Sequence, residues 1–261
     1  MTTRLGILGF GAIGQTVVKS LLSNDVGLEL VGFADQDLIE DAPIPQQTVS
    51  SLIEASDVIV ESAGHAAVKE HAVPILESGT DLMIVSVGAL ADSSLEKKVL
   101  SAQPGQLIIC TGALAGVDYL QAALNLGGIR KISLTSTKKP RVLIRPWMEE
   151  ELRQKLERGD CKVTVFKGNA RESAEAFPKS TNVSATIALA VGNWENVEVE
   201  VVADPEAAQT KHVVEIVGDV GRSKFEVANL PSVSNPATSS IVPHAVVKAL
   251  KNYYGTGYKI L

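Results

Sequence analysis

Short, uninterrupted runs of apolar residues recur through the first part of the chain, separated by segments with a helical period. Such runs are typical of parallel strands that are buried on both faces of a sheet. The regular alternation of strand and helix indicates a doubly wound sheet. The predicted strands are residues 5–8, 28–34, 57–60, 81–85 and 106–110, and the predicted helices are residues 12–23, 66–77 and 93–102.

After Leu114 the pattern changes to an alternation of polar and apolar residues. A period of two indicates strands with one exposed face, as in a mixed or antiparallel sheet. The sequence therefore predicts an α/β fold, with a Rossmann-type doubly wound parallel sheet and a second α+β domain that holds a mixed or antiparallel sheet. The later strands are predicted at 131–135, 197–201, 209–216 and 225–227, with helices at 149–158 and 183–191.

These patterns also predict where the domains begin and end. Residues 1–113 form the expected dinucleotide-binding domain, which the C-terminal segment 235–261 completes, with a last helix over 239–252. Residues 114–234 form the expected substrate, catalytic and dimerisation domain. Two-sheet proteins of this type often dimerise through the second sheet, so we expect a homodimer.

The first strand runs directly into a glycine-rich turn, Gly9-Phe10-Gly11-Ala12-Ile13-Gly14. This is the G-x-G-x-x-G pattern of dinucleotide-binding folds, in its strand-to-helix context. Gly9 permits the tight turn, Gly11 lets backbone amides approach a pyrophosphate, and Gly14 lets the helix pack on the strand. The helix that begins at Ala12 and Ile13 points its positive end toward the phosphates.

An acidic residue, Asp35, ends the second predicted strand, about 20 residues beyond the last glycine. A carboxylate in this position binds the ribose hydroxyls of NAD and repels the 2′-phosphate of NADP. The sequence therefore favours NAD, while NADP stays possible because the following loop can rearrange. The alternative is that Asp35 only ends a strand.

Small residues follow the later strands, in loops suited to close approach by a flat nicotinamide ring. In a fold of this kind the ring lies beyond the carboxyl ends of the strands. Ordinary turns are the alternative for each loop taken alone. Asn182, at the start of an apolar helix, can pair with a carboxamide or act as a helix cap. The candidate cofactor contacts from these segments are Ala63, Gly64, His65, Gly88, Ala113, Gly116 and Asn182.

Four histidines are candidates for acid–base chemistry. His71 is expected to be solvated within its helix, and His244 to pack in the last helix. His65 follows a small loop and can contact the cofactor. His212 shares a strand face with Val214 and Ile216, where a histidine is more often a structural core residue. A dehydrogenase nevertheless needs a base near neutral pH, and histidine suits that role.

Composition narrows the class of protein. The net charge is −6 without a basic run, which argues against a nucleic-acid partner. The chain has no apolar run of the ~18 residues that a membrane span needs and no apolar leader. Cys110 and Cys161 form no metal motif and suggest a reducing compartment, so we expect a cytoplasmic protein without a bound metal.

Several segments, taken in order along nearly the whole chain, resemble the L-aspartate dehydrogenase family. They are Gly9–Gly14, Glu61–His65, Val85–Leu90, Thr111–Asp118, Phe177–Thr186, Ala203–Glu206, His212 and Asn235–Ser239. The resemblance implies oxidation of L-aspartate with NAD or NADP. Iminoaspartate forms first, and it either hydrolyses to oxaloacetate and ammonia or supplies NAD biosynthesis.

The resemblance also implies roles for individual residues. A histidine at the position of His212 is the family's proposed catalytic residue, and the positions of Gly116 and Asn182 bind the nicotinamide cofactor. The family commonly has alanine at position 116, a change that a backbone contact survives. It often has asparagine where this chain has Ser180.

The two carboxylates of aspartate require cations and polar groups. Lys139 is our hypothesis for one of the cations, against the alternative of a solvated surface lysine. Thr238 and Ser239 precede the last helix and can supply hydroxyl or helix-terminus contacts. Two other functions stay open. One is a dehydrogenase or imine reductase for another small amino or keto acid, and the other is a sensor that binds NADH without consuming it.

Overall fold

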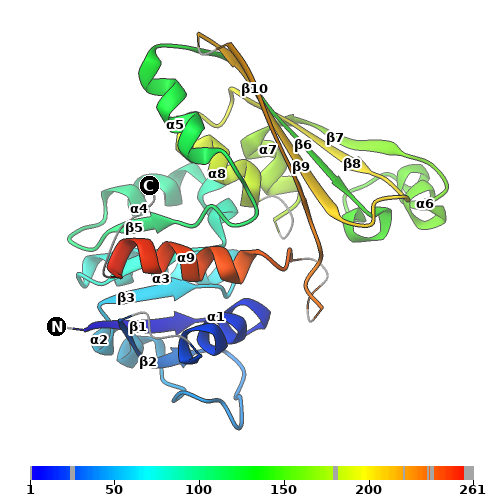
Figure 1. The fold of residues 1–261 in the computed structure, drawn as a ribbon. Coiled ribbons are helices and arrows are strands. Elements are labelled where there is room, and N and C mark those ends of the chain that lie inside the picture. The colour runs from blue at the N-terminus through cyan, green and yellow to red at the C-terminus, as the bar shows by residue number, and fades with distance from the viewer. Residues whose placement is uncertain are drawn as a thin grey trace. The chain divides into compact units, whose positions relative to one another are not determined.

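The computed structural model describes residues 2–23, 27–178, 182–219, 221–233, 235 and 238–255. The chain forms two compact units (Figure 1). The first contains the described residues up to Gly112 and those from Val242 onward, and the second is Ala113–Ile241. The chain thus rejoins the first unit at Val242, whereas the sequence predicted this at residue 235.

The first unit is built on a five-stranded parallel sheet in the order β2-β1-β3-β4-β5. Its strands consist almost wholly of apolar residues, and the middle ones are buried on both faces. This confirms the predicted doubly wound sheet. The strands are β1 (Thr3–Leu8), β2 (Leu28–Ala34), β3 (Val58–Glu61), β4 (Asp81–Ile84) and β5 (Leu107–Ile109).

Helices cover this sheet, and the last helix of the chain lies beside the first (Figure 1). Strand order reverses at β1, which has β2 on one side and β3 on the other, so the carboxyl ends of β1 and β3 mark the topological switch point where such sheets bind ligands. The helices are α1 (Ala12–Leu22), α2 (Val49–Ala55), α3 (His65–Glu77), η1 (Val87–Ala91), α4 (Ser93–Ser101) and α9 (Val242–Tyr254).

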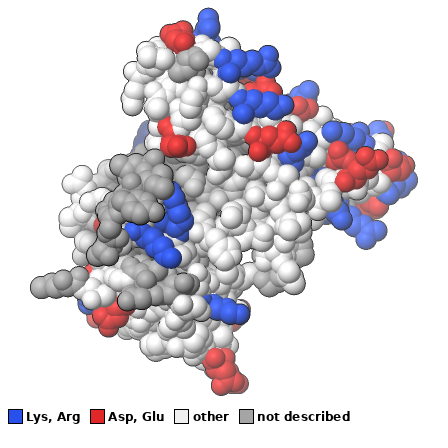
Figure 2. Space-filling view, viewed as in Figure 1, with Lys and Arg blue, Asp and Glu red and all other residues white. Residues whose placement is uncertain are grey.

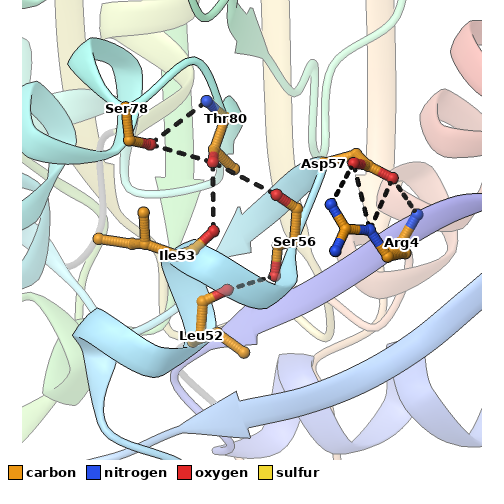
Figure 3. Close-up of polar contacts among 7 residues, drawn as sticks. All are labelled: Arg4, Leu52, Ile53, Ser56, Asp57, Ser78 and Thr80. Carbon is orange, nitrogen blue, oxygen red and sulfur yellow. Dashed lines mark hydrogen bonds and ion pairs between the residues drawn. The ribbon is translucent and has the colours of Figure 1, made fainter.

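Polar contacts stabilise the opposite end of the sheet, where the strands begin (Figure 3). Arg4 on β1 and Asp57 before β3 form an ion pair of 2.7 Å. The Thr80 hydroxyl, before β4, lies 3.3 Å from the carbonyl oxygen of Ser56, whose own hydroxyl donates to the Leu52 carbonyl of α2. These contacts hold the amino ends of the strands in register, and the loops discussed below follow the carboxyl ends.

The second unit holds a mixed sheet in the order β10-β9-β6-β8-β7, in which only β6 and β8 pair in parallel. This confirms the predicted second sheet. Alternate residues are buried along β9 and through most of β6 and β8, as the period of two indicated, while the last three residues of β6 and of β8 are all buried. The strands are β6 (Ile129–Lys138), β7 (Val163–Asn169), β8 (Val197–Ala203), β9 (Thr210–Gly218) and β10 (Gly221–Asn229).

Helices α7 and α8 pack on one face of this sheet, while α6 is strongly charged. Figure 2 shows blue and red side chains mixed over α6, where Glu151 and Lys155 pair one helical turn apart. The helices of the second unit are α5 (Val117–Leu126), η2 (Pro140–Leu143), α6 (Glu150–Arg158), α7 (Ala170–Ala176) and α8 (Asn182–Val191).

The ends of the predicted elements differ from the structure by a few residues. Strand β10 begins four residues earlier than predicted, and the last helix begins three residues later, at Val242, because residues 238–240 pair with the chain after β10. His244 is exposed on this helix, so the prediction that it packs is wrong. Among the described residues, the elements α2, η1, α5, η2, β7 and α7 were not predicted.

Candidate active site

The glycine turn closes tightly against the loop after β3. Gly9 has φ +93°, and a Cβ atom there would lie 2.5 Å from the backbone nitrogen of Ala63. A Cβ at Gly14 would lie 2.2 Å from the Gly9 carbonyl oxygen, so this residue also lets α1 pack closely. Gly11 has open space around it. Because α1 begins at Ala12, the amides of its first turn lie beside this opening.

Asp35 follows β2 and is held against the same turn. Its Oδ2 accepts a hydrogen bond of 2.6 Å from the Phe10 amide, and its Oδ1 accepts one of 3.1 Å from the Asp37 amide. Asp35 therefore does more than end a strand, because it ties β2 to the glycine turn. The carboxylate stays partly exposed. Since a carboxylate offers about four acceptor sites, it can still bind hydroxyl groups.

Glu61, at the carboxyl end of β3, organises the next two loops. The side chain is fully buried. Its Oε1 accepts hydrogen bonds from the Gly64 amide (2.7 Å) and the Ser86 hydroxyl (2.9 Å), and its Oε2 accepts one from the Ser86 amide (3.1 Å). Burial raises the pKa of Glu61, against the effect of these hydrogen bonds. One side chain thereby fixes the loop that leads to His65 and the loop that leads to Gly88.

The loop before α5 belongs to the second unit. Gly116 has the left-handed φ of +76°, and a Cβ there would lie 2.7 Å from the ring of Phe225 on β10. The carbonyl oxygen of Ala113 accepts a hydrogen bond of 3.2 Å from the Asn229 side chain. Strand β10 therefore holds both predicted cofactor residues of this loop in place.

His212 lies on β9, directly opposite Ser136 of β6. The ring is 2% exposed, and its Nδ1 lies 2.9 Å from the Ser136 hydroxyl. When Nδ1 carries the hydrogen and donates it to Ser136, Nε2 keeps a free lone pair. The pKa of His212 falls to about 3, first because of burial and then because of the positive charge of Lys138. The ring is therefore neutral at physiological pH.

Lys138, the last residue of β6, brings a buried cation to the same place. Its side chain is 7% exposed. Burial and, to a smaller extent, the charge of Arg145 lower the pKa of Lys138 to about 8. The neighbouring Lys139 is exposed and lines a surface groove with Thr210 and Pro231. The structure thus puts Lys138, not Lys139, beside His212.

The remaining residues of the second unit that the sequence analysis proposed are Asn182, Thr238 and Ser239, and they lie on α8 and on the chain before α9. Asn182 is the first described residue of α8 and is half-buried, with its carbonyl oxygen accepting from the Thr186 hydroxyl. The adjoining residues 179–181 lie outside the described part. The Thr238 carbonyl oxygen accepts a hydrogen bond of 2.7 Å from the Ser232 amide, and Ser239 pairs with Pro231. Thr238 and Ser239 therefore pair with the chain after β10, three residues or more before α9.

Comparison with known proteins now decides the family. A model described as aspartate dehydrogenase, C-terminal, matches residues 118–253. The L-aspartate dehydrogenase of Ralstonia pickettii is 34% identical to this chain, over an alignment that covers 95% of this chain and 96% of that protein. The chain belongs to the aspartate dehydrogenase family. The family member from Acinetobacter baylyi is 33% identical over 95% of this chain and 97% of its own length.

The first unit of this family member is of the dinucleotide-binding type. A model described as homoserine dehydrogenase, NAD binding domain, matches residues 9–106. The open space at Gly11 and the partly exposed carboxylate of Asp35 fit the pyrophosphate and ribose of such a cofactor.

Solved structures agree on the fold. Aspartate dehydrogenase from Thermotoga maritima superposes with a TM-score of 0.77 at 24% identity, over 99% of both chains. A hyperthermophilic archaeal homoserine dehydrogenase has a TM-score of 0.59 at 13% identity, over 98% of this chain and 99% of that chain. The same architecture therefore serves different members of the dehydrogenases.

Sequence reasoning named neither Lys138 nor Ser136 as site residues, and it quoted Glu61 only within a loop motif. The alternation of β6 contained the missing signal, because Ser136 and Lys138 share the buried face while Lys139 lies beyond the strand. Among the described residues, no helix is long and apolar enough to cross a membrane. The same part of the chain has no cluster of histidine, cysteine or acidic residues that could hold a metal.

Proposed function

We propose that this protein is an NAD(P)-dependent L-aspartate dehydrogenase. The observation that carries the proposal is the likeness to L-aspartate dehydrogenases along 95% of the chain. The residues in the site suit this reaction. A neutral, hydrogen-bonded histidine and a buried lysine occupy one end of the second sheet, and the first unit carries the features of a dinucleotide site.

The reaction begins with an uncharged amino group, because an ammonium group cannot donate its electron pair to form an imine. Cα of aspartate would lose a hydride to a nicotinamide cofactor as the C=N bond forms. The released proton passes to a base. Water then adds to the imine carbon, and ammonia leaves to give oxaloacetate. The nicotinamide therefore supplies the redox chemistry, and the protein supplies proton transfer and orientation.

His212 is the residue we assign to proton transfer. With Nδ1 donating to Ser136, Nε2 can accept a hydrogen bond from the substrate amine or from the attacking water. The low pKa of the free site makes His212 a weak base, and the two negative charges of bound aspartate would act against the positive charge of Lys138, which is the second cause of that low value. The histidine is therefore strengthened as a base when the dicarboxylate is present.

The cofactor contacts follow from the same proposal. Gly9, Gly11, Ala12, Ile13 and Gly14 approach the pyrophosphate, and Asp35 binds the ribose. The remaining proposed contacts, which suit the nicotinamide end, are Ala63, Gly64, His65, Gly88, Ala113, Gly116 and Asn182. NAD is the preferred form, with NADP as the alternative. A homodimer in the cytoplasm completes the proposal.

The test is NADH consumption by purified protein with oxaloacetate and ammonium, followed by absorbance and repeated with NADPH and other keto acids. We expect turnover with oxaloacetate above that with pyruvate or 2-oxoglutarate. Turnover of another keto acid alone would keep the dehydrogenase class and reject the substrate. Tight NADH binding without turnover of any keto acid would support the sensor alternative instead.

A further inference from the structure

The loop that joins β2 to α2 returns along the edge of the first sheet (Figure 1). The Phe33 amide donates a hydrogen bond of 2.9 Å to the Pro45 carbonyl oxygen, and the Gln47 amide donates one of 2.8 Å to the Phe33 carbonyl oxygen. Strand β2 is an edge strand of the sheet, so these bonds use its outer side. The chain after Asp35 is therefore brought back to the strand that it left.

The side chain of Gln46 holds this loop closed. Its Nε2 donates a hydrogen bond of 2.8 Å to the Asp37 carbonyl oxygen and lies 3.4 Å from the Asp35 carbonyl oxygen, while its Oε1 accepts one of 3.0 Å from the Ile39 amide. Both the oxygen and the nitrogen of one half-buried carboxamide thus bind the backbone of residues 35–39. Loss of this side chain would leave those backbone groups to water.

These contacts reach the proposed ribose ligand through Asp37. The Asp35 carboxylate accepts hydrogen bonds from the Phe10 amide and from the Asp37 amide. Asp37 is therefore bound through its amide by Asp35 and through its carbonyl oxygen by Gln46. The position of the Asp35 carboxylate depends on Gln46 in this way.

A 2′-phosphate would disturb this arrangement, whereas a 2′-hydroxyl would not. A hydroxyl can donate to the Asp35 carboxylate, but a phosphate on the ribose would meet its negative charge. Residues 35–47 contain four acidic residues and no lysine or arginine that could pair with the phosphate. The loop would have to move for NADPH to bind, and this movement would break the hydrogen bonds of Gln46.

We propose that Gln46 is a positioning residue for the choice of cofactor, because it holds the loop in the form that binds NADH and resists NADPH. Hydrogen bonds that stay intact with NADH and break with NADPH add directly to the difference between the two affinities. This inference rests on the dinucleotide site of the proposed function, and it names a residue behind the preference for NAD.

The test compares Gln46→Met with wild-type protein by fluorescence titration with NADH and with NADPH. Methionine has nearly the length of glutamine and forms no strong hydrogen bond. The Kd for NADPH divided by the Kd for NADH should fall at least ~5-fold, because two hydrogen bonds of about two- to tenfold each no longer oppose the movement of the loop. A melting curve checks that the variant is folded.

Gln47→Met is the matched control. Gln47 is the neighbouring glutamine and is also half-buried, and its Nε2 donates a hydrogen bond of 2.7 Å to the Val31 carbonyl oxygen of β2. Its replacement removes a comparable bond to the strand and should leave the ratio of the two Kd values within about twofold. An unchanged ratio in Gln46→Met, or an equal fall in Gln47→Met, would overturn the proposal. Equal Kd values for NADH and NADPH in wild-type protein would overturn it as well.

Hydrogen exchange at the Ile39 amide tests the same contact without a variant. This amide donates to Gln46 Oε1, so its exchange becomes faster when the loop opens. We expect faster exchange with saturating NADPH than with saturating NADH. Slower or equal exchange with NADPH would contradict the movement on which the proposal depends.

These measurements need no aspartate, so they separate this inference from the proposed function. If the ratio falls in Gln46→Met but wild-type protein does not convert oxaloacetate, the role of Gln46 stands and the proposed function fails. If oxaloacetate is converted and the ratio is the same in wild type and Gln46→Met, the proposed function stands and the role of Gln46 is rejected.

Discussion

The Ser136 hydroxyl and His212 Nδ1 lie 2.9 Å apart, at directly opposed positions of the antiparallel strands β6 and β9. This contact fixes the plane of a buried imidazole and, when Nδ1 donates to Ser136, leaves the lone pair of Nε2 for the proton transfer that we propose. The two residues are 76 positions apart in the chain, so the contact depends on the register between two strands. A buried histidine held in this way can serve as a base whose orientation is set before the substrate binds.

Replacing His212 with asparagine should therefore reduce turnover at least ~100-fold while leaving NADH affinity nearly unchanged. Asparagine keeps a polar side chain opposite Ser136 but cannot accept a proton. Steady-state kinetics and a fluorescence titration with NADH measure the two effects. Wild-type turnover in this variant would remove His212 from the mechanism.

Asp35 should control the choice between the two nicotinamide cofactors. Asp35→Ala is expected to weaken NAD more than NADP, because it removes both the ribose acceptor and the charge that repels a 2′-phosphate. Asp35→Asn is the matched control, since its side-chain oxygen can still accept from the Phe10 amide. Equal losses for NAD and NADP in Asp35→Ala would show that this carboxylate does not contact the ribose.

Gly116 should not tolerate alanine, although the resemblance to the family suggested alanine there. The left-handed φ of +76° and the ring of Phe225 at 2.7 Å both oppose a Cβ atom. Left-handed backbone alone costs about 1–2 kcal/mol, and the ring overlap adds to it. Gly192→Ala is the control, because Gly192 has a similar φ of +69° with open space around it. Equal shifts in the melting temperatures of the two variants would mean that Phe225 moves away without cost.

Glu61 should make stability depend on pH. Its pKa is raised in the folded protein, so the folded state holds a proton that the unfolded state has lost above pH 4.5. The contribution of Glu61 to the free energy of unfolding is therefore present at low pH and falls as pH rises through the raised pKa. Glu61→Gln does not titrate, so its melting temperature should gain on that of wild type as pH rises from 4.5. A constant difference across that range would contradict the raised pKa.

The fold was predictable where one face or both faces of an element are apolar. Strand β2 was predicted at its observed limits, because its apolar run is bounded by Gly27 and Asp35. Helix α6 begins one residue later than predicted. Short elements such as α2 and α7 have too few turns to give a clear period, and tertiary packing determines them.

The site was less predictable, because it depends on register and burial. Lys138 and Lys139 are adjacent in sequence, and a shift of one residue decides which side of the sheet a side chain occupies. From the sequence we proposed Lys139, whereas in the structure β6 ends at Lys138, whose side chain is the buried one. Glu61 follows an apolar run in the same way as Asp35 does, yet Glu61 is fully buried while Asp35 stays partly exposed. Only the three-dimensional fold shows that one of these carboxylates is buried and the other is partly exposed.

The most direct test of the account follows the hydrogen on Cα. Purified protein is incubated with NAD and L-aspartate that carries deuterium at Cα, and the NADH formed is analysed by mass spectrometry. The account predicts one deuterium in each NADH formed, at the transferred position, with oxaloacetate and ammonia as the other products. Formation of NADH without deuterium, or the absence of NADH when the protein is folded and binds NAD, would contradict it.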